Sequence, residues 1–202
     1  MLIVDAHEDL AWNYLTFGRD YMLSANETRN RERGSATPTH NGDTLLGWPD
    51  YQRGKVAVIF SSLFAAPIRR KEGDWDIQCY TDTSQAKFFY HAQLDVYRRV
   101  CERYPDRCQL IQVKNDLQAI LEHWINQAEP HPIGLVLLME GAEAIETPAD
   151  IEIWWQSGVR ILGPAWAGNR FCGGTHEPGP LTPASIRERR TGRSNPAWAR
   201  GL

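Results

Sequence analysis

The chain has 202 residues, of which 42% are hydrophobic and 23% charged, a composition typical of one soluble globular domain and too apolar for a disordered chain. The formal net charge of −3 argues against general binding to nucleic acid or anionic lipid, because both need a basic surface. No run of about 18 uncharged apolar residues is present, which predicts that no segment spans a membrane. The first residues also lack a basic leader, so we expect no signal peptide and a cytoplasmic location.

The order of apolar runs predicts the strands of the fold. Near-continuous apolar runs at residues 2–6, 55–65 and 134–139 indicate buried strands, and residues 108–113 and 159–162 are shorter candidates. Helical patterns separate most of these runs. This alternation favours an α/β fold in which parallel strands are joined by helices.

Three helices are predicted between the later strands. The longest covers residues 84–104, with Thr83 or Ser84 as its cap and an apolar stripe of Phe88, Ala92, Val96 and Val100. Asn115 is the predicted cap of a second helix. Thr147 and Pro148 are expected to begin a third, which ends at Gly158. The polar stretch 22–50 has no periodicity and is predicted to be a loop with short helical turns over one end of the sheet.

The four cysteines have spacings that fit neither a paired redox motif nor a zinc knuckle. We expect Cys79, Cys101, Cys108 and Cys172 to be free thiols.

His7 and Asp9 form the first candidate for chemistry. They lie two residues apart at the end of the first predicted strand, so both side chains project to the same side. An imidazole and a carboxylate that converge beyond a strand suit a divalent metal such as zinc. The alternative is that His7 only closes the strand and Asp9 begins a turn.

Glu140 is the second candidate, because it directly follows the buried run 134–139. Burial of a charged carboxylate is costly without a partner, which a metal ion or a basic side chain would supply. A structural pairing with a lysine, an arginine or a backbone amide remains an equal alternative. Trp166, after the last predicted strand, is interpreted either as a pocket wall or as a packing residue. The remaining histidines are interpreted as surface or packing residues: His40, His91, His123, His131 and His176.

These segments together resemble the membrane (renal) dipeptidase family. The segment Asp5–Leu10 resembles its Asp-x-His-x-Asp-Leu opening, and residues 53–56 with the apolar run after them look like its second strand. Residues 138–141 resemble its metal-bridging glutamate segment, and residues 158–162 with 179–182 are similar to its next strand and loop. The resemblance covers roughly residues 1–182, and the order of the motifs makes it specific.

The resemblance implies the N-terminal part, roughly the first half, of a TIM-like (β/α)8 barrel with two zinc ions. It implies that His7 and Asp9 ligate one zinc and that Glu140 bridges both. The implied activity is the hydrolysis of dipeptides by a metal-bound hydroxide. In many members a histidine that helps to bind substrate occupies the position of Trp166.

The family's later ligands, two histidines, have no counterpart before residue 202, and residues 183–202 are basic, irregular and without an apolar stripe. We therefore expect residues 1–182 to form a partial barrel and residues 183–202 to form an irregular tail. The hypothesis for this tail is that it is translated out of frame or is the product of a truncated gene. Three ligand residues cannot complete two zinc shells, which predicts weak metal binding and little activity. Unpaired strand edges predict self-association.

Two alternatives remain beside the dipeptidase interpretation. The chain could be an inactive fragment or pseudo-enzyme whose strands resemble half a barrel. It could also be a metal hydrolase of the amidohydrolase type, but those enzymes typically carry His-x-His on the first strand, where this chain has an aspartate at position 9.

Overall fold

The computed structural model describes residues 1–126, 129–169 and 171–173, and all structural statements below concern these residues. The predictions for His176, for residues 179–182 and for the tail 183–202 lie outside them. The larger strands are β1 (Ile3–Glu8), β2 (Val56–Leu63), β5 (Cys108–Leu110), β6 (Ile133–Glu140) and β7 (Val159–Gly163). The helices of the later part are α5 (Thr83–Arg103), α6 (Lys114–Asn126) and α7 (Asp150–Gln156).

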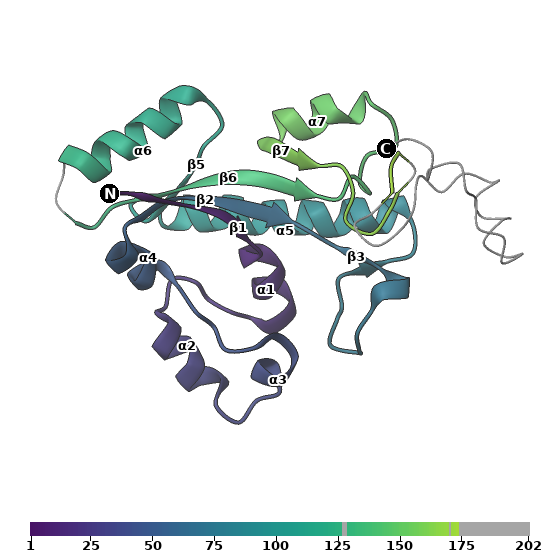
Figure 1. The fold of residues 1–202 in the computed structure, drawn as a ribbon, viewed down its shortest axis with the longest axis horizontal. Coiled ribbons are helices and arrows are strands. Elements are labelled where there is room, and N and C mark those ends of the chain that lie inside the picture. The colour runs from purple at the N-terminus through teal and green to yellow at the C-terminus, as the bar shows by residue number, and fades with distance from the viewer. Residues whose placement is uncertain (127–128, 170, 174–202) are drawn as a thin grey trace, which may run out of the picture.

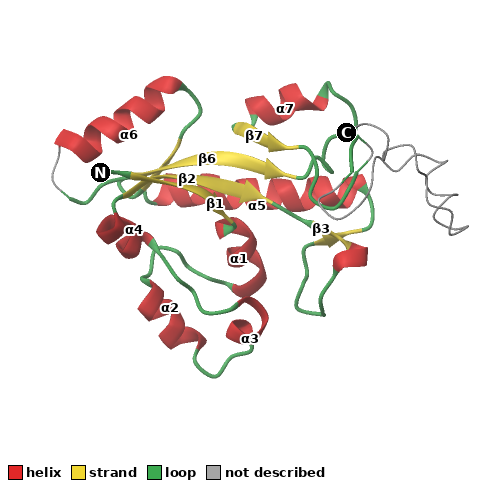
Figure 2. Cartoon of the chain, in the orientation of Figure 1, coloured by secondary structure: helices red, strands yellow, loops and turns green. Residues whose placement is uncertain are grey.

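One parallel sheet organises the molecule, in the order β1-β2-β6, with both β5 and β7 paired to β6. β5 pairs with residues 133–135 of β6, and β7 pairs with residues 137–140. Figure 2 shows the arrows of β2, β6 and β7 pointing the same way, so their carboxyl ends share one edge of the sheet. The alternating order of strands and helices confirms the predicted α/β class with parallel strands.

β2 and β6 form the centre of the core. Most residues of both strands are buried, including Ile59, Leu63, Leu137 and Met139. The predicted strand covered on both faces is therefore confirmed for β2. α5 runs along the sheet and contacts β2, β4 and β5 (Figure 1). This packing fixes the carboxyl ends of the central strands, where the candidate site lies.

The apolar stripe predicted for α5 was right at Val96, which is buried, and wrong at Phe88. Phe88 is 68% exposed, and the buried face consists of Ala86, Tyr90, Gln93, Leu94, Val96 and Tyr97. Residues four apart advance about 40° around a helix of 3.6 residues per turn, so a stripe of three such steps turns about 120° away from its start. The core-facing surface follows mixed spacings of three and four instead.

The predicted helix caps were also wrong. α5 is capped by Asp82, whose side chain accepts a hydrogen bond from the amide of Gln85 at 2.9 Å. α6 begins at Lys114, before the predicted cap Asn115. α7 begins at Asp150 after Ala149, which makes no side-chain cap. Asp82 thus caps the first turn of α5, as is general at a helix start. Asp116 and Asp150 instead accept hydrogen bonds from amides that precede α6 and α7, those of Val113 and Glu146.

The stretch between β1 and β2 contains more helix than predicted: α1 (Leu10–Phe17), α2 (Ala25–Glu32), α3 (Thr37–Asn41) and α4 (Trp48–Gly54). Ser24 and Glu27 form a capping box at the start of α2, a local signal that the sequence carried. A buried ion pair between Arg19 and Glu32, 2.7 Å from Nε to Oε1, ties α2 to the end of α1. These helices lie together on one side of the sheet in Figure 1.

A small second sheet follows β2. It consists of β3 (Ala66–Pro67) and β4 (Cys79–Tyr80), with a single 3-10 turn at Ile68–Arg70 between them. The four cysteines are free thiols, as predicted. Within the described residues, no helix combines the length and apolar character that crossing a bilayer requires.

Candidate metal centre

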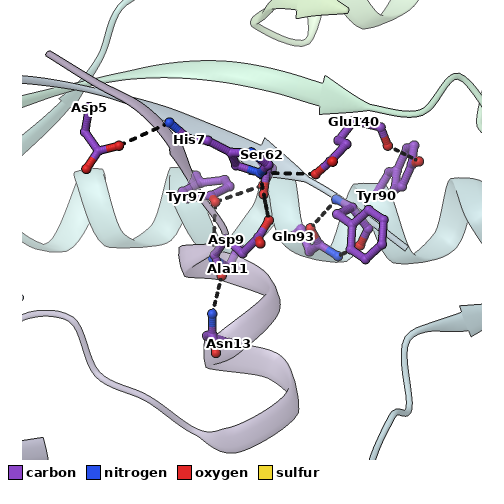
Figure 3. Close-up of polar contacts among 11 residues, drawn as sticks. Asp5, His7, Asp9, Ala11, Asn13, Ser62, Tyr90, Gln93, Tyr97 and Glu140 are labelled. Atoms are coloured by element: carbon purple, nitrogen blue, oxygen red, sulfur yellow. Dashed lines mark hydrogen bonds and ion pairs between the residues drawn. The ribbon is translucent and has the colours of Figure 1, made fainter. Parts of the chain in front are cut away.

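The structure brings the three predicted ligand residues together at the carboxyl ends of β1 and β6. Nε2 of His7 lies 3.3 Å from Oδ1 of Asp9 and 3.1 Å from Oε2 of Glu140. One candidate ligand atom from each residue lies within 4.8 Å of the others. Figure 3 shows the three side chains pointing toward one another. His7 therefore contacts both carboxylates, and among the described residues the basic partner of Glu140 is this histidine rather than a lysine or arginine.

The end of β1 sets the directions of His7 and Asp9. His7 lies in β1 and Asp9 directly follows Glu8, its last residue, and the 3.3 Å contact between the two side chains shows that they point to the same side. Asp9 occupies the position before α1, but its side chain does not cap that helix. It accepts a hydrogen bond from the hydroxyl of Ser62 instead, while its backbone carbonyl accepts one from the side chain of Asn13 at 3.0 Å. The carboxylate is thus directed toward His7 rather than used for local structure.

Glu140 is positioned by the turn that ends β6. Gly141 has a φ of +77°, a left-handed conformation that favours glycine, and its amide donates to the carbonyl of Gly163 at 2.9 Å. The buried hydroxyl of Tyr90 lies 2.9 Å from the carbonyl oxygen of Glu140 and 3.2 Å from that of Gly141, and can donate to either. These contacts hold the backbone of Glu140 while its carboxylate reaches His7.

A second set of contacts links the site to the core, and the sequence interpretation missed it. The fully buried Tyr97 donates its hydroxyl to the carbonyl of Ser62 at 2.9 Å and accepts from the amide of Ala11 at 3.2 Å. Tyr97 and Ser62 therefore join α5, β2 and the start of α1 around Asp9. The one available signal was the pair Ser61-Ser62, two hydroxyl residues at the end of an otherwise apolar strand.

The electrostatics of the site favour positive charge. Its side chains are partly open to solvent, with exposed fractions of 43% for His7, 40% for Asp9 and 24% for Glu140. The hydrogen bond with Asp9 is the largest influence on His7 and raises its pKa to about 9. Burial raises the pKa of Glu140, and burial together with nearby Asp5 raises the pKa of Glu8 to about 8.

The donor set fits a divalent metal ion. One imidazole nitrogen and two carboxylate oxygens are common ligands of zinc. In a tetrahedral zinc site with bonds of about 2.0–2.1 Å, neighbouring ligand atoms lie about 3.3–3.4 Å apart. The separations of His7 Nε2 from Asp9 and Glu140, 3.3 and 3.1 Å, are close to this spacing. Among the described residues, this is the one group of three or more potential ligands that comes together in this way.

The other histidines within the described residues make packing contacts, in line with their interpretation from the sequence. His91 stacks on Trp154, His131 on Trp124 and His40 on Trp75, with ring centroids 4.4 to 5.0 Å apart. His123 contacts His131 edge-on. None of these rings belongs to the group of candidate ligands that comes together among the described residues.

Trp166 follows β7 and packs against Phe64, which follows β2. The two ring centroids are 4.9 Å apart with an interplanar angle of 67°. Trp166 also borders Gly141, because a Cβ placed on that glycine would lie 3.7 Å from the Cβ of Trp166. Trp166 is therefore both a packing residue and a neighbour of the candidate metal centre.

Solved structures with a similar fold include proteins described as dipeptidases and metallopeptidases. A crystal structure of dipeptidase AC, described as a metallopeptidase, matches 86% of this chain with a TM-score of 0.58 and 20% identity. A metallopeptidase from Rhodobacter sphaeroides, solved with a phosphinate mimic of the dipeptide L-Ala-D-Ala, matches 83% at a TM-score of 0.56 and 18% identity. The probable dipeptidase PvdM from Pseudomonas aeruginosa matches 96% at a TM-score of 0.58 and 14% identity.

This chain spans about half of each of these proteins, 46%, 46% and 45% of their lengths. No model of a known protein family matches the chain, and no curated protein matches it. At these identities the matches establish the fold. They confirm the predicted fold class, a partial TIM-like barrel, and the predicted resemblance to the N-terminal part of the membrane dipeptidase family at the level of the fold.

Proposed function

We propose that this protein is a zinc-binding member of the membrane dipeptidase family and that its chemistry is the hydrolysis of dipeptides. One observation carries the proposal: His7, Asp9 and Glu140 converge at the carboxyl ends of parallel strands. Active sites of α/β barrels gather at this end of the strands. The shared fold with three structures described as dipeptidases or metallopeptidases supports the choice of reaction.

Each residue has a defined role in this proposal. His7 and Asp9 would hold one zinc ion, and the carboxylate of Glu140 would be shared between this ion and a second one. The hydroxyl of Ser62 orients Asp9, and Tyr90 holds the backbone of Glu140. Zinc, when bound, supplies a Lewis acid that polarises the scissile carbonyl and activates water at neutral pH.

The number of ligands sets the expected strength of binding. Catalytic zinc usually takes about three protein ligands, and three residues cannot complete two such shells. We therefore propose that this chain alone binds zinc weakly and turns over dipeptides slowly or not at all. Catalytic competence and metal binding are separate properties, and metal binding is the one to test first.

Titration calorimetry with zinc tests the proposal, using the wild-type chain and the variants His7→Ala and Glu140→Gln. Each variant removes one of three ligands and is expected to weaken zinc binding by more than about 100-fold. The loss should exceed this value because removing a residue that only supports a ligand already weakens metal binding by up to about 100-fold. His40→Ala is the matched control, because His40 is exposed, stacks on Trp75 and does not belong to the group of candidate ligands found among the described residues. Equal zinc affinity in the wild type and in His7→Ala would overturn the proposal.

A further inference from the structure

An aromatic pair stands beside the candidate metal centre. Phe64 is the first residue after β2, and Trp166 lies three residues after β7. β6, which carries Glu140, lies between these two strands in the sheet. The contact between the two rings, with centroids 4.9 Å apart, therefore spans the carboxyl end of β6. We call Phe64 and Trp166 together the aromatic wall.

The Phe64 side of the wall is fixed by a buried amide. The amide of Phe64 donates to Oε1 of Gln93 at 2.8 Å, and Nε2 of Gln93 donates back to the carbonyl of Phe64. Gln93 is fully buried and also donates to Oε1 of Gln78 at 2.8 Å. A buried polar group that is fully hydrogen-bonded in this way makes its surroundings rigid. The backbone of Phe64 is thus held in place from α5.

The Trp166 side is fixed by its own loop. The side-chain oxygen of the buried Asn169 accepts hydrogen bonds from the amides of Phe171 at 2.9 Å and Cys172 at 3.0 Å. The guanidinium of Arg69 donates to the carbonyl of Ala167. Both sides of the wall are therefore preorganised, and a ligand that packs against it loses little free energy in ordering the protein.

The wall leaves an apolar surface next to a polar centre. Trp166 keeps 37% of its surface exposed, although it is the largest apolar side chain and is packed against Phe64. His7, Asp9 and Glu140 at the neighbouring strand ends can bind a polar group, whereas the indole face offers apolar contact. A dipeptide has both features, because its amide and carboxylate lie within a few bonds of its side chains.

We propose that the aromatic wall of Phe64 and Trp166 selects dipeptides that carry an uncharged apolar side chain, and aromatic side chains above all. This inference rests on the proposed function and specifies its substrate class. Aromatic pairs in offset or edge-to-face geometry gain stabilisation beyond the burial of their area, and the Phe64–Trp166 pair already shows that the indole accepts this geometry. A lysine-like side chain is the main competitor, because a cation can also bind an indole face.

The test uses the zinc-loaded chain of 202 residues and three phosphinic dipeptide mimics that differ in one side chain: benzyl, methyl or aminobutyl. The mimics are not hydrolysed, so calorimetry and quenching of tryptophan fluorescence report binding without turnover. The wild type is expected to bind the benzyl mimic at least about tenfold more tightly than the methyl mimic. Trp166→Ala is expected to lose this preference, and Trp166→Phe to keep most of it.

Trp155→Ala is the matched control. Trp155 is also half-exposed, but it lies on α7 under the guanidinium of Arg160, with 3.8 Å from Cζ to the ring centroid. This variant is expected to keep the benzyl preference, and all three variants are expected to bind zinc like the wild type.

The outcomes separate this inference from the proposed function. If zinc and the methyl mimic bind but benzyl gives no advantage, or if Trp166→Ala keeps the advantage, the selectivity is wrong and the metal centre stands. Tightest binding of the aminobutyl mimic also overturns it. If neither zinc nor any mimic binds the wild type, the proposed function and the inference fail together.

Discussion

Two strands supply the candidate ligands, and they are held in very different ways. β6 lies in the middle of the sheet, where most of its residues are buried between β2 and the paired strands β5 and β7. β1 lies at the edge of the described sheet, pairs with β2 alone and has mostly exposed side chains, with Val4 56% exposed.

This difference shows that packing aligns one part of the site and that hydrogen bonding aligns the other. Glu140 is placed by the core around β6. His7 and Asp9 are placed by polar contacts at the end of β1, where Ser62 donates to Asp9 and Tyr97 bonds the amide of Ala11. Stability is therefore expected to depend on β6, and the geometry of the ligands on the contacts at the end of β1.

The largest expected effect is in β6. Leu137→Ala removes a side chain that is 1% exposed and leaves a cavity in the core. Substitutions of this kind lower the free energy of unfolding by about 2–5 kcal/mol. Urea denaturation followed by circular dichroism measures the loss. A change below about 1 kcal/mol would show that the centre of the sheet is not the part that stabilises the fold.

A smaller loss is expected at the link between core and site. Tyr97→Phe removes the hydroxyl that bridges Ser62 and Ala11, and leaves the amide of Ala11 and the carbonyl of Ser62 without that partner. The cost of such buried unpaired groups is about 1–3 kcal/mol. The same denaturation experiment checks it, with Tyr14→Phe as a control at an exposed tyrosine. Equal stability of both variants would contradict the role given to Tyr97.

Ser62→Ala tests the orientation of Asp9 directly. Removal of a group that hydrogen-bonds a metal ligand typically weakens metal affinity by about 10–100-fold. Zinc titration should show this loss, and the variant should remain folded. Ser61 supplies the control, since its buried hydroxyl has no hydrogen-bond partner within the described part of the chain and Ser61→Ala is expected to leave zinc affinity unchanged. A similar loss in both variants would mean that burial, and not the contact with Asp9, is responsible.

The smallest effect is expected on the exposed face of β1. Val4→Ala shortens a side chain that is largely in solvent, and such substitutions change the free energy of unfolding by about 0.5 kcal/mol or less. Denaturation of this variant beside Leu137→Ala gives the contrast between the two strands. A loss above about 2 kcal/mol would show that β1 is buried in solution, for example by self-association through its outer edge in the described sheet.

The sequence predicted the fold better than the details of its helices. Long apolar runs such as 134–139 identify buried strands with little ambiguity, and the alternation of elements leads to a parallel sheet. The cap of α5 was predicted wrongly and its buried face only in part correctly, because several polar residues compete for a cap and only tertiary contacts decide which face of a helix is buried. Gln93, for example, is polar and buried, so an apolar pattern in the sequence does not predict its burial.

At the candidate site, too, the sequence predicted some features and missed others. Strand periodicity placed His7 and Asp9 on one side, and the end of a buried run singled out Glu140. β1 and β6 lie on either side of β2, close enough for His7 to contact Glu140. This proximity follows from the order of strands in the sheet, which neither segment reveals by itself. Ser62, Tyr90 and Tyr97 were missed for this reason, since their contacts join residues 50 or more positions apart, or bridge α5 to β2.

Zinc K-edge X-ray absorption of the zinc-loaded chain tests the metal centre most directly. A site built from His7, Asp9 and Glu140 predicts a shell of nitrogen and oxygen at about 2.0–2.2 Å with the scattering pattern of one imidazole, which is lost in His7→Ala. A shell containing sulfur at about 2.3 Å, or a spectrum that His7→Ala leaves unchanged, would contradict it, because zinc would then be bound at the cysteines or at other surface groups.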